Sequence, residues 1–465
     1  MSVTPQPQEL ISTNPTHPDQ ILGKVTIASQ ADIQKAITAT RAVQPVWRAL
    51  GPAGRAAELR KLYSYIFANR TRFEELETRE MGRPIMESRG TFDWGFAQFA
   101  WNLDHAEGVL APTTTYEDEK SLHQTVYEPY GVVGSIAPWN FPFSNWIMGA
   151  LQPLLAGNAV VYKPSEEVPL SAQAIADAWV QAGLPRDVFC IVHGGGEVGE
   201  MLARAFVDFI DFTGSFRTGQ HIYKIAAERF VPVRLELGGS DAGIVFDDCD
   251  IDAILEPIFW AKFVNCGQIC CGLKRLFVQR KAFPAVAEKL VAFVRAQKIG
   301  DPMNADTLIG PLVAKRQRDL LCEQVDDARA KGAKVLCGGA TLPNTEGYYY
   351  KPTVLTDVVP AMRAYHEELF GPVLPLWSFD TEEEAVQLAN ATPYGLSAHV
   401  FTDDRQRFQR IASQLQAGSV SHNGLDYGHP ANPFGGYKFS GIGRVCGAVG
   451  LRQSSQIKTV SQRKE

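Results

Sequence analysis

Strands and helices alternate through the middle of the chain, and this alternation limits the possible folds more than any other feature. Short apolar runs typical of buried strands are separated by amphipathic stretches of helical length. The predicted strands cover 132–137, 159–162, 188–192 and 207–212, and the predicted helices cover 142–156, 170–182, 196–205 and 215–230. This order predicts an α/β fold with a parallel, doubly wound sheet, which binds ligands at the carboxyl ends of its strands.

A second α/β region begins near Leu237. Its predicted helices are 251–263, 283–297, 314–331 and 382–390, and its predicted strands are 243–245, 396–401 and 419–421. Ahead of the first sheet, after an irregular start, helical patterns cover 31–43, 54–69, 71–81 and 85–108. Pro45 is expected to end or kink the first of these helices before Trp47.

Two alternating segments lie outside both regions. Residues 121–130 and 454–461 have the period of β-strands. The later one follows a compact domain, so we expect an exposed strand that can pair with another subunit.

Composition excludes several classes of protein. A chain of 465 residues is too long for one simple core, and its net charge of −6 without a Lys/Arg cluster argues against nucleic acid or an anionic membrane as the main partner. Residues 1–10 lack an apolar signal region, and no apolar run has membrane-spanning length. The eight cysteines show no disulfide-scaffold or zinc-ribbon spacing, so we expect a reduced, cytoplasmic protein.

Three of the eight cysteines fall within residues 263–272. A thiolate is the most nucleophilic side chain near neutral pH, so Cys266, Cys270 and Cys271 are candidates to attack a carbonyl carbon. They form no C-x-x-C pair and have no histidine at ligand spacing, so we expect no metal site.

Three segments could bind a nucleotide cofactor. Gly214 and Ser215 close a predicted strand and open a helix, and Gly196 belongs to a Gly194-x-Gly196-x-x-Gly199 run, although a plain strand-to-helix turn explains either pattern equally well. Lys163 and Glu166 follow a buried strand, where a carboxylate can accept hydrogen bonds from ribose hydroxyls and repel a 2′-phosphate. A solvated loop is the alternative for this segment.

Five motifs occur in a characteristic order. They are Pro138-Trp139-Asn140-Phe141-Pro142, Leu235-Glu236-Leu237-Gly238-Gly239, Gly267-Gln268-Ile269-Cys270, Glu368-Leu369-Phe370-Gly371-Pro372-Val373, and the run from Asn432 to Gly441. Their order and spacing resemble the NAD(P)-dependent aldehyde dehydrogenase superfamily, in its short form, from about Asn14 to the C-terminus.

The resemblance implies a role for each matching residue. Cys270 would be the nucleophile, Glu236 the general base and Asn140 the oxyanion donor. Lys163 and Glu166 would hold the adenosine ribose, Ser215 the pyrophosphate, and Glu368 with Phe370 the nicotinamide riboside. The full set of implied cofactor contacts is Trp139, Lys163, Ser165, Glu166, Gly196, Gly214, Ser215, Leu237, Glu368 and Phe370. Glu166 favours NAD and still admits NADP.

The resemblance also implies three structural parts. Residues 1–111 and 130–238 would form a Rossmann-like NAD-binding domain, and residues 239–440 an α/β catalytic domain. Residues 112–129 and 441–465 would form a small β extension for oligomerisation, in a homodimer or homotetramer.

The substrate is expected to be a small aldehyde. Ser240-Asp241 and Lys274-Arg275 are similar to the succinate-semialdehyde branch, but Met148 stands where that branch has an arginine for the substrate carboxylate. Phe141, Met148 and Phe434 would instead line an apolar, partly aromatic pocket, which favours a medium-sized aliphatic or aromatic aldehyde over a semialdehyde.

Three other functions fit part of the sequence. A coenzyme-A-acylating relative would gain nothing from a water-activating base such as Glu236. A catalytically silent relative would not need to keep Cys270, Glu236 and Asn140 together. A cysteine hydrolase would need a histidine base near the thiol and would leave the motif at Glu368 unexplained.

Overall fold

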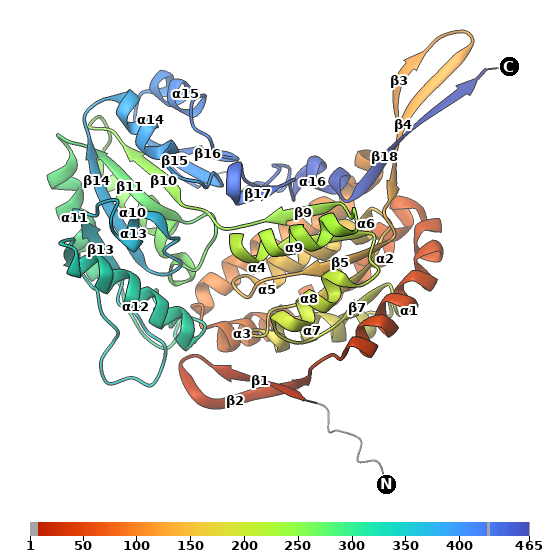
Figure 1. Cartoon of the computed structure of the whole chain (residues 1–465), viewed down its shortest axis with the longest axis horizontal. Coiled ribbons are helices and arrows are strands. Elements are labelled where there is room, and N and C mark those ends of the chain that lie inside the picture. Colours follow the sequence, from red (N-terminus) through yellow and green to blue (C-terminus); the bar gives the residue numbers. More distant parts are fainter. Residues whose placement is uncertain (1–7, 426–427, 465) are drawn as a thin grey trace.

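The computed structural model describes residues 8–425 and 428–464, and two large β-sheets occupy the two halves of the molecule (Figure 1). The first sheet has six strands in the order β17-β9-β8-β5-β6-β7, all parallel except β17. The strands are β5 (Val132–Ile136), β6 (Ala159–Lys163), β7 (Phe189–Ile191), β8 (Phe209–Thr213), β9 (Val233–Glu236) and β17 (Gly441–Ile442). The predicted doubly wound parallel sheet is confirmed.

Both faces of this sheet are buried, because successive side chains along a strand point to opposite sides. Val133 and Val160 belong to one hydrophobic core, whereas their neighbours Val132 and Val161 belong to another. Strands that are buried on both faces have nearly continuous apolar sequences, which is why the sequence identified them.

Helices cover both faces of the sheet (Figure 1). They are α1 (Gln30–Ala49), α2 (Gly51–Ala68), α3 (Arg70–Met81), α4 (Ile85–Leu110), α5 (Pro142–Trp146), α6 (Gln152–Leu155), α7 (Pro169–Gln181), α8 (Gly196–Arg204), α9 (Phe216–Glu228) and α16 (Gly447–Gln453). A π-helical turn, η1 (Ile147–Leu151), joins α5 to α6.

The second sheet has seven strands in the order β12-β13-β14-β11-β10-β15-β16. They are β10 (Asp241–Val245), β11 (Leu273–Gln279), β12 (Lys334–Cys337), β13 (Thr353–Thr356), β14 (Val373–Phe379), β15 (Ser397–Phe401) and β16 (Ser419–His422). Its helices are α10 (Ile251–Phe263), α11 (Phe283–Arg295), α12 (Lys315–Ala330), α13 (Arg363–His366), α14 (Glu382–Asn390) and α15 (Arg405–Ala412), with short 3-10 turns at η2 (Val264–Gly267) and η4 (Lys438–Ser440).

The N-terminal region differs from the sequence-based expectation. An antiparallel hairpin, β1 (Glu9–Asn14) and β2 (His17–Thr26), replaces the predicted irregular start. Its turn is held by a hydrogen bond from Thr16 N to Asn14 Oδ1 (2.9 Å), and Ser12 Oγ donates to the buried Glu80 carboxylate (2.7 Å). Tertiary contacts of this kind leave no pattern in the local sequence.

Of the two predicted effects of Pro45, the end of its helix is wrong, and a kink there stays a prediction. Helix α1 continues to Ala49, because its last turns are anchored by the buried Trp47, whose Nε1 donates to Leu154 O at 2.8 Å. Pro45 itself is exposed, so the ring meets no packed neighbour.

A three-stranded antiparallel sheet projects from the body of the molecule (Figure 1). It has the order β18-β4-β3, with β3 (Thr113–Glu117), β4 (Ser121–Pro129) and β18 (Ser455–Arg463). Both predicted extension segments therefore contribute strands to one sheet, whereas β17 and α16 pack on the first half of the molecule. Assembly through this sheet remains a prediction, as do the three domain boundaries. Residues 1–7, 426–427 and 465 of the predicted domains lie outside the described residues.

Within residues 8–425 and 428–464, no helix is both long and apolar enough to cross a membrane.

Glu80 is expected to anchor the hairpin to the body. Its carboxylate accepts hydrogen bonds from Ser12 Oγ, Leu170 N, Ser171 N and Ser171 Oγ at 2.6–2.8 Å. Replacing it with alanine leaves these buried donors without an acceptor. Glu80→Ala should therefore lower the free energy of local opening of the hairpin by about 2 kcal/mol. Hydrogen exchange of residues 9–26 measures this effect.

The control is Glu9→Ala, which removes only an exposed pair with Lys24. Equal exchange of the hairpin in the two variants would contradict the anchoring role of Glu80.

Candidate active site

The carboxyl edge of the first sheet gathers most of the predicted site residues. Asn140 follows β5, Lys163 ends β6, Ser215 follows β8 and Glu236 ends β9. The sheet order β9-β8-β5-β6 places these four segments side by side at one edge, where an open parallel sheet binds its ligands.

The loop with the predicted nucleophile enters this edge through an unusual turn. Asn265, Cys266 and Gly267 have φ angles of 52°, 55° and 74°, which are left-handed values that side chains rarely adopt. A Cβ atom at residue 267 would collide with the backbone of Gly371, so glycine is required there.

Buried hydrogen bonds hold the turn. Asn265 N donates to Glu87 Oε2 at 2.6 Å, and Asn265 Nδ2 donates to Asn140 O at 2.8 Å. Gln268 Nε2 donates back to Asn265 O at 3.0 Å, and Asn140 Nδ2 donates to Gln268 O at 3.2 Å. The network therefore fixes the Asn140 amide against the loop that continues to Cys270.

The three cysteines of the loop differ in accessibility. Cys266 and Cys271 are buried, whereas the Cys270 thiol is half-buried. Cys266 Sγ donates to Gly310 O at 3.3 Å, and burial raises the pKa of this thiol far above its usual range. A hydrogen bond with Cys271, followed by burial, raises the pKa of Cys270, whereas the charge of Lys274 lowers it.

Glu236 is a fully buried carboxylate at the end of β9. Neither of its oxygens has a hydrogen-bond partner among the described residues. Burial raises its pKa well above the usual glutamate value, against the opposing charges of Arg234 and Arg444. A Cβ atom on Gly435 would lie 2.6 Å from Glu236 Oε1, so this glycine gives the carboxylate room.

The residues predicted to hold adenosine and pyrophosphate fit that task. Lys163 Nζ donates to Pro164 O at 2.6 Å and lies 3.8 Å from the half-buried carboxylate of Glu166, beside Ser165. Burial lowers the pKa of Lys163, and the carboxylate opposes this effect.

Two helix N-termini open at the same edge, at Gly196 and after Gly214-Ser215. Ser215 caps α9 by accepting a hydrogen bond from Thr218 N, and added Cβ atoms at Gly195 or Gly196 would meet no atom within 4 Å. Space beside unpaired backbone N–H groups suits a pyrophosphate.

The nicotinamide end of the predicted site combines both halves of the molecule. The Trp139 and Phe370 rings meet edge to face, with centroids 5.5 Å apart. Glu368 Oε1 lies 3.0 Å from Lys274 Nζ and accepts a hydrogen bond from Gly239 N at 3.1 Å. Leu237, the remaining predicted contact, is buried after β9 and donates its N–H to Ser440 O at 2.9 Å.

The three predicted pocket residues are all partly exposed. Phe141 follows Asn140 directly, and the Arg83 guanidinium lies over its ring at 4.7 Å. Met148 lies on η1 and its carbonyl accepts from Arg234 Nη2 at 3.0 Å. Phe434 precedes the glycine that faces Glu236.

Some residues of this region were not predicted. Arg316 of α12 pairs with Glu167 at 2.7 Å and lies 3.7 Å from Glu166, so the second half of the molecule places a cation beside the predicted ribose carboxylate. Arg234, which lies two positions before Glu236, forms a buried ion pair with Asp211. The sequence signal that could have indicated Arg234 is the unusual presence of an arginine inside an apolar strand.

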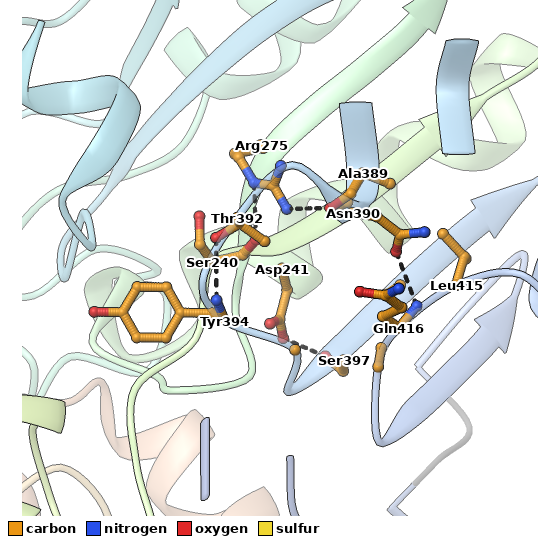
Figure 2. Close-up of a pocket in the computed structure, with 14 residues that line it drawn as sticks. Ser240, Asp241, Arg275, Ala389, Asn390, Thr392, Tyr394, Ser397, Leu415 and Gln416 are labelled. Atoms are coloured by element: carbon orange, nitrogen blue, oxygen red, sulfur yellow. Dashed lines mark hydrogen bonds between the residues drawn. The ribbon is translucent and has the colours of Figure 1, made fainter. Parts of the chain in front are cut away.

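A small cavity behind the site is not a substrate pocket. Figure 2 shows that Ser240, Asp241 and Arg275 lie around it, and its volume is about 10 Å³. This is room for about one water molecule. Arg275 is fixed there by hydrogen bonds to Ser240 O, Leu388 O and Ala389 O at 2.8–2.9 Å, so its role is structural.

Comparisons with known proteins agree with this geometry. The aldehyde dehydrogenase family model matches residues 3–460. A betaine aldehyde dehydrogenase of Cereibacter sphaeroides is 38% identical over 437 residues, which cover 93% of this chain and 89% of that relative. The crystal structure of an NAD-dependent aldehyde dehydrogenase from Sinorhizobium meliloti is similar with a TM-score of 0.94 and 34% identity, covering 98% of this chain and 91% of the other.

An NADP dependent enzyme of E. coli is similar with a TM-score of 0.94 and 33% identity, covering 98% of this chain and 95% of the other. The chain therefore belongs to the aldehyde dehydrogenase family, and it is an enzyme of that class.

The environment of Cys270 predicts its reactivity without cofactor. Since its pKa is raised, the rate of alkylation by iodoacetamide should rise about tenfold per pH unit from pH 7 to 9, following the thiolate fraction. Cys271→Ala removes the hydrogen bond that raises this pKa, so it should accelerate the reaction severalfold at pH 8. Peptide mass spectrometry measures both rates, and a plateau already reached at pH 7 would contradict the assignment.

Proposed function

We propose that this aldehyde dehydrogenase oxidises a neutral, medium-sized aliphatic or aromatic aldehyde to a carboxylic acid, with NAD as its preferred cofactor. The observation that carries the proposal is the placement of Asn140 and Glu236 at one edge of the first sheet. The Asn140 amide is hydrogen-bonded to the loop of the half-buried Cys270, and the buried Glu236 carboxylate has no hydrogen-bond partner among the described residues.

The first step forms a bond between Cys270 Sγ and the aldehyde carbon. The thiol proton leaves through water or Glu236, and the carbonyl oxygen becomes an oxyanion. Asn140 Nδ2 and the Cys270 backbone N–H donate hydrogen bonds to that oxyanion. An amide is suited to this task because it donates without titrating.

NAD, when bound, supplies the acceptor for the hydride that the adduct loses. Lys163 and Glu166 would hold its adenosine ribose, the Ser215 helix terminus its pyrophosphate, and Glu368 its second ribose. The similarity to an NAD-dependent relative supports this choice of cofactor. The Glu166 carboxylate favours NAD over NADP because it would repel a 2′-phosphate.

Glu236 completes the reaction by activating water. It removes a proton as the water oxygen attacks the thioester carbon, the carbon–sulfur bond breaks, and the carboxylic acid leaves. A buried carboxylate without partners is a stronger base than an exposed one, because burial disfavours its charged form.

The preference for a neutral substrate rests on the pocket side chains. Met148 offers a thioether and no charge to a substrate carboxylate, which argues against succinate semialdehyde. Betaine aldehyde, the substrate named for the Cereibacter relative, carries a quaternary ammonium that binds best over aromatic faces. One face of Phe141 is already occupied by the Arg83 guanidinium, which leaves only the other face for a substrate cation.

A panel of aldehydes tests the proposal. We expect kcat/KM for hexanal or benzaldehyde to exceed the values for betaine aldehyde and succinate semialdehyde by at least about tenfold, the scale of one well-placed pocket contact. The assay follows NADH with and without coenzyme A, and Cys270→Ala is the inactive control. A preference for either charged aldehyde would overturn the substrate assignment, and full activity of Cys270→Ala would overturn the mechanism.

The base predicts a pH dependence. Because the pKa of Glu236 is raised, the carboxylate ionises only above the ordinary glutamate range, so the rate of thioester hydrolysis should rise with pH through that raised value. Glu236→Gln should slow hydrolysis by about 100-fold or more and abolish the rise of its rate with pH. Single-turnover release of the acid, measured across a range of pH, gives the rate of hydrolysis. If the rate rises with pH in Glu236→Gln as it does in the wild type, Glu236 is excluded as the base.

A further inference from the structure

A buried lysine links the nucleophile loop to the cofactor-binding carboxylate. Lys274 lies on β11, and its Nζ contacts Cys270 O at 2.6 Å, Ile269 O at 2.9 Å and Glu368 Oε1 at 3.0 Å. An ammonium has three protons to donate, so these three acceptors satisfy it completely. The side chain is only 2% exposed.

The far end of this link is also fixed. Glu368 Oε1 accepts the Gly239 N–H as well, and a Cβ atom on Gly238 would collide with the Glu368 carboxylate. Lys274 Nζ lies 5.8 Å from the centroid of the Phe370 ring. The lysine therefore stands between the loop with Cys270 and the residues proposed to surround the nicotinamide riboside.

We propose that Lys274 is a positioning residue for the oxidation, which fixes the Cys270 loop to Glu368 and favours the Cys270 thiolate by its positive charge. The proposal rests on the proposed roles of Cys270 and Glu368. It adds an electrostatic link between Cys270 and Glu368. The positive charge of Lys274 stabilises the Cys270 thiolate, and the negative charge of Glu368 reduces this stabilisation by neutralising the lysine.

The surrounding charges are consistent with a permanently charged lysine. The titratable groups that face this point are Lys262 from α10, Asp241 from β10, Cys270 and Cys271 from the loop, Glu368, and Tyr394. Burial opposes the charge of Lys274, but Glu368 and Asp241 outweigh it, so the pKa of Lys274 is raised.

The decisive measurement is the pH profile of Cys270 alkylation in the cofactor-free enzyme. Lys274→Met keeps the length of the side chain without its charge, and should move the midpoint up by roughly one pH unit, with about tenfold slower alkylation at pH 7.5. Glu368→Gln removes the opposing charge and should move the midpoint down. Lys274→Arg should stay near the wild-type midpoint, because it keeps the charge.

Lys262→Met is the matched control. Lys262 is a buried lysine on the adjacent helix that donates to Leu369 O at 3.2 Å, and it makes no hydrogen bond to the nucleophile loop within the described structure. Its loss should leave the midpoint within a few tenths of a unit. Circular dichroism establishes that each variant is folded.

Opposite shifts for Lys274→Met and Glu368→Gln, with the wild-type midpoint kept in Lys274→Arg, support the proposal, because a merely structural lysine would not act through its charge. Unchanged midpoints in both variants overturn it. If Lys274→Met does not fold, the downward shift of Glu368→Gln together with the retained midpoint of Lys274→Arg decides the question. The readout is independent of turnover, so failure of the proposed function would appear separately, as activity that survives in Cys270→Ala.

Discussion

The left-handed turn at Asn265–Gly267 is the constraint on which the active site depends. Its two non-glycine residues cost roughly 1–2 kcal/mol each in backbone strain. The buried hydrogen bonds from Asn265 to Glu87 and Asn140 oppose this cost. Since Asn140 belongs to the same network, the forces that fold the turn also hold the proposed oxyanion donor against the loop with Cys270. The same hydrogen bonds therefore stabilise the strained backbone of the turn and align Asn140 with the Cys270 loop.

Buried charge is distributed unevenly around this turn. Arg234 is paired with Asp211, and Lys274 with Glu368, so these cations are compensated where they are buried. Glu236 is the exception, since its carboxylate has no hydrogen-bond partner in the described residues. An uncompensated buried carboxylate destabilises the folded protein in its ionised form, and such a group marks a functional site more often than a structural one. Its readiness to accept a proton is the property that thioester hydrolysis requires.

The sequence predicted the framework of the fold because that framework is periodic. The predicted helices 251–263 and 382–390 coincide with α10 and α14, and β5, β6, β7 and β8 of the first sheet lie within a few residues of their predicted bounds, whereas β9 and β17 were not predicted. Strand β11 was not predicted, because Lys274 and Arg275 interrupt its apolar pattern. Both are buried, and each has an acceptor distant in the sequence, Glu368 Oε1 for Lys274 and Ala389 O for Arg275, which local periodicity cannot indicate.

In the candidate site, too, local sequence motifs predicted some residues, whereas residues held there by tertiary contacts were missed. Motif spacing predicts roles for Cys270, Glu236 and Asn140. The first sheet places the segments of Glu236 and Asn140 at one edge, and Asn140 is hydrogen-bonded to the loop that leads to Cys270. Glu87 and Arg316 were not identified, because each reaches the site from a distant part of the chain. Such contacts follow from tertiary packing and are invisible to a reading of local sequence.

The central claim is that the substrate becomes a thioester on Cys270 and that Glu236 delivers the water that releases it. The most direct test is mass spectrometry of Glu236→Gln after rapid mixing with hexanal and NAD. The account predicts a covalent acyl group, in amounts close to one per chain, on the peptide that contains Cys270. No acyl adduct, or an adduct confined to Cys266 or Cys271, would contradict it.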